Sequence, residues 1–153
     1  QEDKNKWLVQ KNEDYLSYLV NMDFSEILPG VTPILQFLKE NNQGIALGSA
    51  SKNARPILEK TGIISYFDVI VDGNDVTNAK PDPEVFLQAA KGLHIPNEKA
   101  IVFEDSVAGI QAANIAKMTS IGIGEASILH EAQYIFKDFT FMDMSFIESL
   151  IKK

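Results

Sequence analysis

The sequence predicts an α/β fold of three layers, in which a Rossmann-like parallel sheet has helices on both faces. From about Val31 onward, short apolar runs alternate with amphipathic stretches, and this alternation is typical of repeated βαβ units. The apolar runs show no regular polar alternation, as expected of strands that are covered on both sides. The 153 residues are enough for one domain of this kind with a buried core.

Five apolar runs are the predicted strands, at residues 45–47, 69–71, 101–103, 121–123 and 139–141. The first predicted helix follows Pro29 and Gly30. It carries apolar residues at i, i+3, i+4 and i+7 from Val31 to Leu38, and the polar run 41–44 ends it.

Two further helices follow the later strands. The stretch from Phe86 to Leu93 is helical in period, with Asp82 as its predicted N-cap and Pro83 in its first turn. A helix after Ser106 is rich in small residues, which would let its backbone lie close to the sheet: Ala108, Gly109, Ala112, Ala113 and Ala116.

Residues 1–28 differ from the rest of the chain. A helical apolar stripe within Lys6 to Met22 has no predicted strand before it, and residues 23–29 have the composition of a connector. We therefore treat residues 1–28 as a separate piece from residues 29–153.

Composition excludes several classes of function. The net charge is −7 and no run of Lys and Arg occurs, so we expect neither nucleic-acid binding nor docking on an anionic membrane. The absence of cysteine excludes disulfides and zinc–thiolate sites. His94 and His130 lack metal-ligand spacing, and we expect both at the surface. No membrane span or signal peptide is visible in the sequence, so a cytoplasmic location is the default expectation.

Polar clusters follow three predicted strands at their carboxyl ends, where open α/β sheets bind ligands. The first is residues 48–53, whose small residues, hydroxyls and exposed amides suit a phosphate group. Plain helix capping by Ser51 or Asn53 is the alternative. The second is residues 80–83, where a proline-fixed turn would hold the Lys80 ammonium beside a phosphate. A solvated lysine before a helix is the alternative there.

The third cluster is the adjacent carboxylates Glu104 and Asp105, followed by Ser106. Two neighbouring carboxylates are costly to hold together unless a cation neutralises them, and Mg²⁺ suits such oxygen ligands. Capping of the next helix would need only one of these residues. After the second strand, residues 72–75 (Asp-Gly-Asn-Asp) could extend this polar edge, but a solvated turn is the simpler interpretation.

The order of these clusters resembles the haloacid dehalogenase (HAD) superfamily. The resemblance implies that Ser49 holds the transferring phosphoryl group, that Lys80 neutralises it, and that Glu104 and Asp105 help to bind Mg²⁺. The segments 49–53, 80–86 and 104–112 are most similar to the β-phosphoglucomutase-like members. In those members, the residues at positions 51–53 would contact the second, non-transferring phosphate of a sugar bisphosphate. The implied phosphate- and substrate-binding residues are Ser49, Ala50, Ser51, Lys52, Asn53 and Lys80, and the implied catalytic residues are Ser49 and Lys80.

The nucleophile of this superfamily lies in an Asp-x-Asp motif at the end of the first core strand. No Asp-x-Asp after an apolar run occurs upstream of Ser49. The resemblance therefore implies that residues 1–28 hold the last helix of a helical cap domain with its connector, and that residues 29–153 are a HAD-like core without its first strand. The two parts of the sheet would then expose unpaired edges. We expect a piece of a longer enzyme, inactive in turnover without the N-terminal segment.

The expected activity is Mg²⁺-dependent phosphoryl transfer on a small sugar phosphate. The resemblance implies interconversion of β-glucose 1-phosphate and glucose 6-phosphate through a bisphosphate. One alternative is a HAD-type sugar-phosphate or phosphoglycolate phosphatase. Another is a receiver-like phosphate-binding module, although in receivers the acidic pair follows the first strand and the lysine comes last. A pseudoenzyme that keeps only the anion site is a third.

Overall fold

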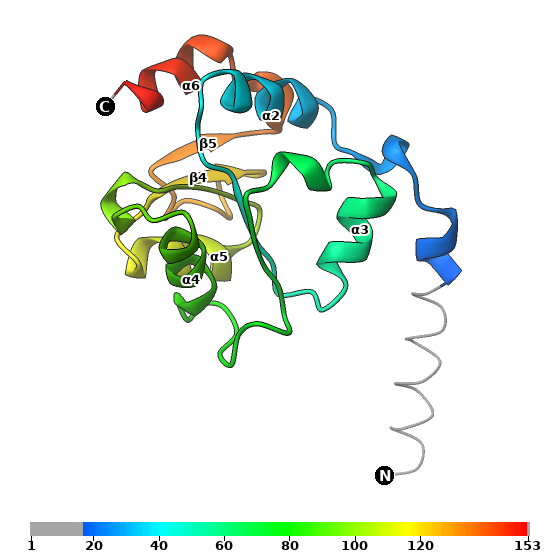
Figure 1. The fold of residues 1–153 in the computed structure, drawn as a ribbon. Helices are drawn as coiled ribbons and strands as arrows, with labels where there is room; N and C mark the ends of the chain where they lie inside the picture. The colour runs from blue at the N-terminus through cyan, green and yellow to red at the C-terminus, as the bar shows by residue number, and fades with distance from the viewer. Residues whose placement is uncertain (1–16, 153) are drawn as a thin grey trace.

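The computed structural model describes residues 17–152 (Figure 1). Of the helix predicted over Lys6 to Met22, residues 17–21 are helical, and the part before residue 17 lies outside the described residues. The strands are β1 (Ala46–Gly48), β2 (Val69–Val71), β3 (Ile101–Glu104), β4 (Thr119–Ile123) and β5 (Tyr134–Phe136). The helices after residue 30 are α2 (Val31–Glu40), α3 (Ala54–Lys60), α4 (Glu84–Gly92), α5 (Val107–Ile115) and α6 (Met144–Ile151).

The strands form two separate parallel sheets. β1 pairs with β2, with Leu47 opposite Ile70, and β4 lies between β3 and β5, with Phe103 opposite Ile121. Within residues 17–152, no strand pairs with the second edge of β1 or of β3. The α/β class with parallel strands is confirmed, and the sheet is divided in two as the sequence led us to expect.

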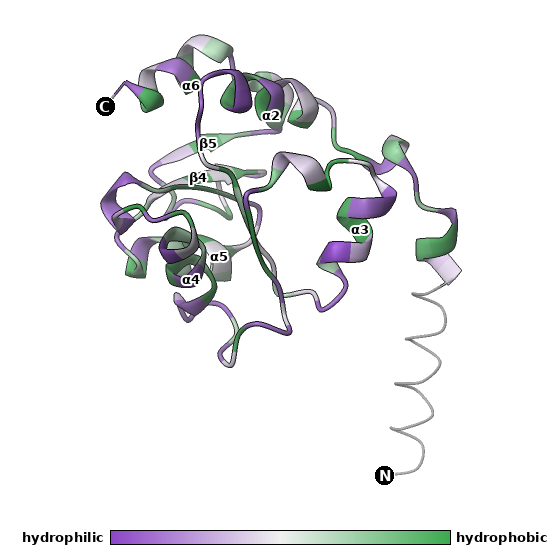
Figure 2. Ribbon diagram, viewed as in Figure 1, coloured by the Kyte–Doolittle hydropathy of each residue, from purple (hydrophilic) through white to green (hydrophobic). Residues whose placement is uncertain are grey.

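Helices cover both faces of these sheets (Figure 1). α2 and α6 cover one face of the three-stranded sheet, where Ile34 and Ile147 pack against Ile121 of β4. On the other side, α4 and α5 share a core with β2 and β3, in which Phe86 and Ala112 are buried. In Figure 2, α2, α3 and α6 each show hydrophobic and hydrophilic segments, as amphipathic helices do. None of the helices in the described residues is long and apolar enough to cross a membrane.

The fifth predicted strand is wrong. Residues Phe139–Phe141 form a 3-10 helix, because the Asp138 carboxylate accepts a hydrogen bond from the Thr140 N–H and caps a turn there. The fifth strand is instead Tyr134–Phe136, whose two aromatic rings lie 5.2 and 4.9 Å from the ring of Phe146 on α6. Packing on α6 therefore decides which of two similar apolar runs is extended.

The helix boundaries agree with the sequence more closely. α2 ends at Glu40 with Asn41 as its C-cap, and Ser106 is the N-cap of α5, its hydroxyl accepting from the Gly109 N–H. α4 begins later than predicted, with Pro83 rather than Asp82 at the N-cap, although the Asp82 carboxylate still accepts from the first helical N–H. His94 and His130 are both exposed, as expected.

Candidate functional site

Lys80 joins the carboxyl ends of β1 and β3. Its Nζ lies 2.7 Å from Oε2 of Glu104 and 3.2 Å from the carbonyl oxygen of Gly48. The same ammonium lies 4.7 Å from the centre of the Phe86 ring. The Lys80 and Glu104 side chains are only 14% and 9% exposed, so this cation is held in a defined place between the two sheets.

The loop that presents Lys80 is anchored by the start of α4. The Glu84 carboxylate accepts hydrogen bonds from the N–H groups of Thr77 and Asn78. These bonds to the backbone hold the pKa of Glu84 below its usual value. The predicted proline-fixed turn is present, and the Lys80–Pro81 peptide bond is cis.

Both oxygens of Glu104 are already occupied. Oε2 accepts from Lys80, and Oε1 accepts from the N–H and the hydroxyl of Ser106. Burial opposes ionisation of this carboxyl, but the hydrogen bond and the charge of Lys80 outweigh it and hold the pKa of Glu104 below its usual value. Glu104 is therefore a carboxylate in this structure.

Asp105 is the exposed member of the acidic pair. Partial burial, and then the adjacent Glu104 carboxylate, raise the pKa of Asp105 above its usual value. A cation bound here would relieve that repulsion. No group of three or more His, Asp and Glu side chains able to hold a metal occurs within residues 17–152.

The loop of residues 49–53 follows β1 at the same edge. The Ser49 hydroxyl accepts from the Ser51 N–H, and the Ser51 hydroxyl accepts from the Asn53 N–H. Ala50 and Lys52 are exposed, and the Lys52 ammonium forms no hydrogen bond or ion pair with the described residues. Capping explains part of this cluster, since Ser51 holds the amide of the N-cap residue Asn53. Helix capping and phosphate binding were the two interpretations of this cluster from the sequence.

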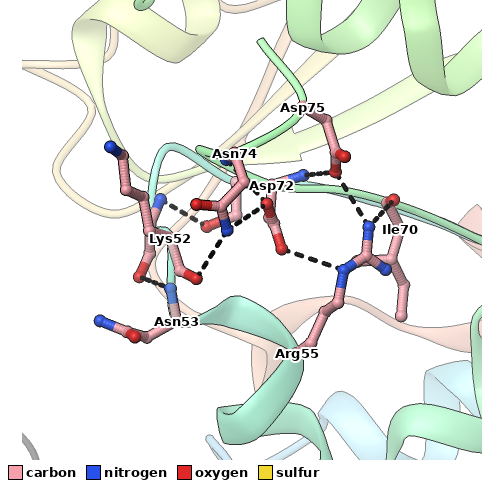
Figure 3. Close-up of polar contacts among 9 residues, drawn as sticks. Lys52, Asn53, Arg55, Ile70, Asp72, Asn74 and Asp75 are labelled. Atoms are coloured by element: carbon pink, nitrogen blue, oxygen red, sulfur yellow. Dashed lines mark hydrogen bonds and ion pairs between the residues drawn. The ribbon is translucent and has the colours of Figure 1, made fainter.

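The prediction of a solvated turn after β2 is wrong for Asp72, which is buried. Its side chain is 2% exposed, and its Oδ2 accepts from Nε of Arg55 at 3.1 Å (Figure 3). Asn74 and Asp75 are exposed, as predicted. Arg55 was not singled out from the sequence, because a lone arginine at a helix start carries no signal of its partner. The one available signal was that Asp72 directly follows a buried strand.

The described edge thus brings together three of the sequence-predicted groups. The Lys80 ammonium lies at the ends of β1 and β3, the loop that carries Ser49 and Ser51 follows β1, and Asp105 follows β3. Ammonium groups and backbone N–H groups bind phosphate oxygens, whereas carboxylates bind hard cations. The arrangement is suited to a phosphorylated ligand together with a divalent cation.

The comparison with known families agrees with this geometry. A family model described as haloacid dehalogenase-like hydrolase matches residues 1–117, more than half of the chain. The chain belongs to this family. The chain is 34% identical over 135 residues to the β-phosphoglucomutase of Bacillus subtilis. This alignment covers 88% of the chain and 60% of that relative.

Two further proteins are similar to the chain. A crystal structure of β-phosphoglucomutase from Clostridium difficile superposes with a TM-score of 0.91 at 37% identity, covering 99% of the chain and 68% of that structure. A phosphorylated carbohydrates phosphatase of Thermotoga maritima is 40% identical over 103 residues, covering 64% of the chain and 48% of that protein. The chain therefore spans about three fifths and about half of these two curated relatives, one of which is named a mutase and the other a phosphatase.

Proposed function

We propose that the complete protein is a Mg²⁺-dependent phosphoryl-transfer enzyme of sugar phosphates, and specifically a β-phosphoglucomutase. The observation that carries the proposal is the position of Lys80, whose ammonium bridges the Gly48 carbonyl oxygen at the end of β1 and the Glu104 carboxylate at the end of β3. A rigid cation there would stabilise negative charge on a phosphoryl group in transfer.

Each residue of the edge has a role in this proposal. Ser49 would donate its hydroxyl to the transferring phosphoryl group, and Lys80 would neutralise its charge. Ser51, Asn53 and the exposed Lys52 would bind the non-transferring phosphate of a bisphosphate, and the exposed Ala50 is proposed as a further substrate-binding residue. Catalysis would then rest on positioning and charge neutralisation by groups that are already fixed before the substrate arrives.

The acidic pair fits a divalent cation. Asp105 is exposed in part, and burial of the rest together with the adjacent Glu104 carboxylate raises its pKa; a cation would offset that neighbouring charge. Glu104 is bound to Lys80, so of the two carboxylates Asp105 is the one open to a metal, and Asp105 together with Glu104 would hold it. Bound Mg²⁺ would supply charge neutralisation for the phosphoryl oxygens.

The nucleophile is proposed to come from a segment outside the described residues. The free edges of β1 and β3 can each accept a strand, and Lys80 connects the ends of these two strands. An apolar strand ending in Asp-x-Asp, placed between them, would bring its first carboxylate beside Lys80 and Asp105. The intact mass of the natural protein, measured under denaturing conditions, tests this: a species of 17.0 kDa alone would contradict it.

The assay must separate a mutase from a phosphatase. The full-length protein, with any residues that its gene encodes ahead of Gln1, is incubated with Mg²⁺, β-glucose 1-phosphate and a trace of glucose 1,6-bisphosphate. A mutase forms glucose 6-phosphate without releasing inorganic phosphate. Release of phosphate in equal amount to substrate consumed would establish the phosphatase instead, a possibility supported by the similarity to the Thermotoga maritima enzyme.

Variants of the β1 loop give a second test. Replacing Lys52 and Asn53 together should weaken the affinity of a mutase for the bisphosphate, because both residues are proposed to face its second phosphate. A monophosphatase has no such phosphate to bind and should be little changed. Unaltered bisphosphate affinity in this double variant would contradict the mutase assignment.

A further inference from the structure

The loop after β2 holds the phosphate-binding loop after β1 in place. Among the ionisable side chains of the described residues, Asp72 is the only one in the buried class, with 1% of its surface exposed. A buried carboxylate is stable only when it is paired and hydrogen-bonded. Asp72 meets this condition through Arg55 on one oxygen and through the N–H and the side-chain amide of Asn74 on the other.

The contacts continue from Asp72 to both neighbouring elements (Figure 3). Nη2 of Arg55 donates to the carbonyl oxygen of Ile70 at 3.0 Å and to the Asp75 carboxylate at 2.9 Å. The Asp75 carboxylate in turn accepts from the Asp72 N–H. Arg55 lies in the first turn of α3, so these bonds fix the start of that helix to the end of β2.

The loop after β1 is hydrogen-bonded to the same network. The Asn74 amide donates to the carbonyl oxygen of Lys52 at 3.0 Å, and the Gly73 N–H donates to the carbonyl oxygen of Ser51 at 3.1 Å. A Cβ at Gly73 would lie 2.4 Å from the carbonyl oxygen of Ala50, so only glycine permits this approach of the two backbones. Two successive peptide groups of the loop are thereby oriented from one side.

The orientation of these carbonyl groups determines where the amides point. In a trans peptide, the C=O and the N–H point in opposite directions. The Ser51 carbonyl is directed toward Gly73, so the Lys52 N–H is directed away from the β2 loop. Within residues 17–152, that N–H has no hydrogen-bond acceptor, and the Lys52 side chain beside it is exposed.

We propose that Asp72 is a positioning residue for substrate binding, which acts with Arg55 and Asn74 to fix the peptide groups of Ser51 and Lys52. The Lys52 N–H is then prearranged for the non-transferring phosphate of a sugar bisphosphate, without any contact between Asp72 and the substrate. This inference rests on the proposed function. It makes Asp72 a determinant of bisphosphate affinity that contacts the binding loop and not the substrate.

The test uses Asn74, an exposed member of the network. Asn74→Ala removes the side-chain amide bonds to the Lys52 carbonyl and to the Asp72 carboxylate. It should weaken affinity for glucose 1,6-bisphosphate by at least about fivefold, the effect of one neutral hydrogen bond, with kcat unchanged within about twofold. The matched control is Asn41→Ala, which removes an amide bond to the Phe37 carbonyl at the end of α2. The control should leave bisphosphate affinity at the wild-type value.

A second variant strengthens the test. Asp72→Asn keeps the shape of the side chain but leaves the Arg55 charge without its buried partner, and it should weaken bisphosphate affinity more than Asn74→Ala does. Amide hydrogen exchange at Asn53, whose N–H is bonded to the Ser51 hydroxyl, should accelerate in both variants and not in Asn41→Ala. Faster exchange with wild-type affinity would overturn the inference, because the network would then stabilise the loop without serving the ligand.

Titration with inorganic phosphate and with glucose 1,6-bisphosphate separates this inference from the proposed function. If the wild-type protein binds both but turns over no sugar phosphate, the proposed function fails, and weaker binding by Asn74→Ala still supports the positioning role. Turnover with bisphosphate affinity equal in wild type and Asn74→Ala overturns the inference alone. Absence of any binding by the wild type overturns both.

Discussion

Replacing Gly109 with alanine should displace the Glu104 carboxylate from Lys80. Gly109 lies in the first turns of α5, where its backbone N–H donates to the Ser106 hydroxyl. An ideal Cβ at this position would lie 2.0 Å from Cδ of Glu104 and 2.2 Å from its Oε2. Contacts of a real Cβ are essentially never shorter than 3.0 Å, so the Glu104 carboxylate has to move.

The size of the movement follows from these distances. Reaching 3.0 Å requires a displacement of about 1 Å, which would lengthen the Glu104–Lys80 contact from 2.7 Å to about 3.7 Å, beyond hydrogen-bonding range. Loss of a hydrogen bond between charged groups costs about 1.5–3 kcal/mol. Alanine recovers about 1 kcal/mol through its helix propensity. We therefore expect a net loss of roughly 0.5–2 kcal/mol in the free energy of unfolding, together with a fall in turnover.

The assay is urea unfolding of the full-length protein together with Mg²⁺-dependent turnover of β-glucose 1-phosphate. The control is Gly92→Ala, which also adds a methyl group between a helix and a strand. Its Cβ would lie 2.8 Å from Cγ1 of Val69, at the amino end of β2 and away from the site. Gly92→Ala should keep wild-type turnover. If Gly109→Ala also kept wild-type turnover and stability, the role given to the Glu104–Lys80 pair would be refuted.

Three further predictions concern single charged residues. Lys80→Met should reduce turnover by a factor on the order of 10²–10³ and destabilise the fold by about 3 kcal/mol, because it leaves Glu104 without its cation. Steady-state kinetics and urea unfolding measure the two effects, and near-wild-type turnover would contradict the role of Lys80. Asp105→Asn should raise the Mg²⁺ concentration for half-maximal turnover roughly tenfold. Chelation of Mg²⁺ should abolish turnover in the wild type and in this variant. An unchanged Mg²⁺ requirement in Asp105→Asn would contradict the role of Asp105 as a ligand. The hydrogen bond from Lys39, and then that from the Ile45 N–H, hold the pKa of Asp68 below its ordinary 3.8, so its stabilising effect is present above pH 3.8 and is lost as pH falls through the lower folded pKa. The stability difference between wild type and Asp68→Asn should accordingly disappear in acid, and a difference that persisted at pH 2 would contradict this.

Much of the architecture could be predicted because it depends on local patterns. The strand at Val69–Val71 is where its apolar run placed it, and Asn41 ends α2 as the polar run after Leu38 indicated. The order of Ser49, Lys80 and Glu104 along the chain was enough to indicate the family, since parallel strands bring their carboxyl ends to one edge. These features follow from side-chain periodicity and from positions near strand ends.

The tertiary structure decided what depends on distant neighbours. The runs 134–136 and 139–141 are similarly apolar, and only the packing of Phe146 against Tyr134 and Phe136 distinguishes the strand from the turn. The pairing of Glu104 with Lys80 had likewise been invisible, although each residue was named.

Asp72 shows the physical reason most clearly. The sequence by itself determined that a polar turn follows β2, and the local composition of that turn is typical of solvated loops. Whether a carboxylate can leave water depends instead on the cation and the donors that meet it in the folded chain. Arg55 reaches Asp72 from another element, so the burial of this residue, and the hold of its loop on residues 51 and 52, were decided only when the chain folded.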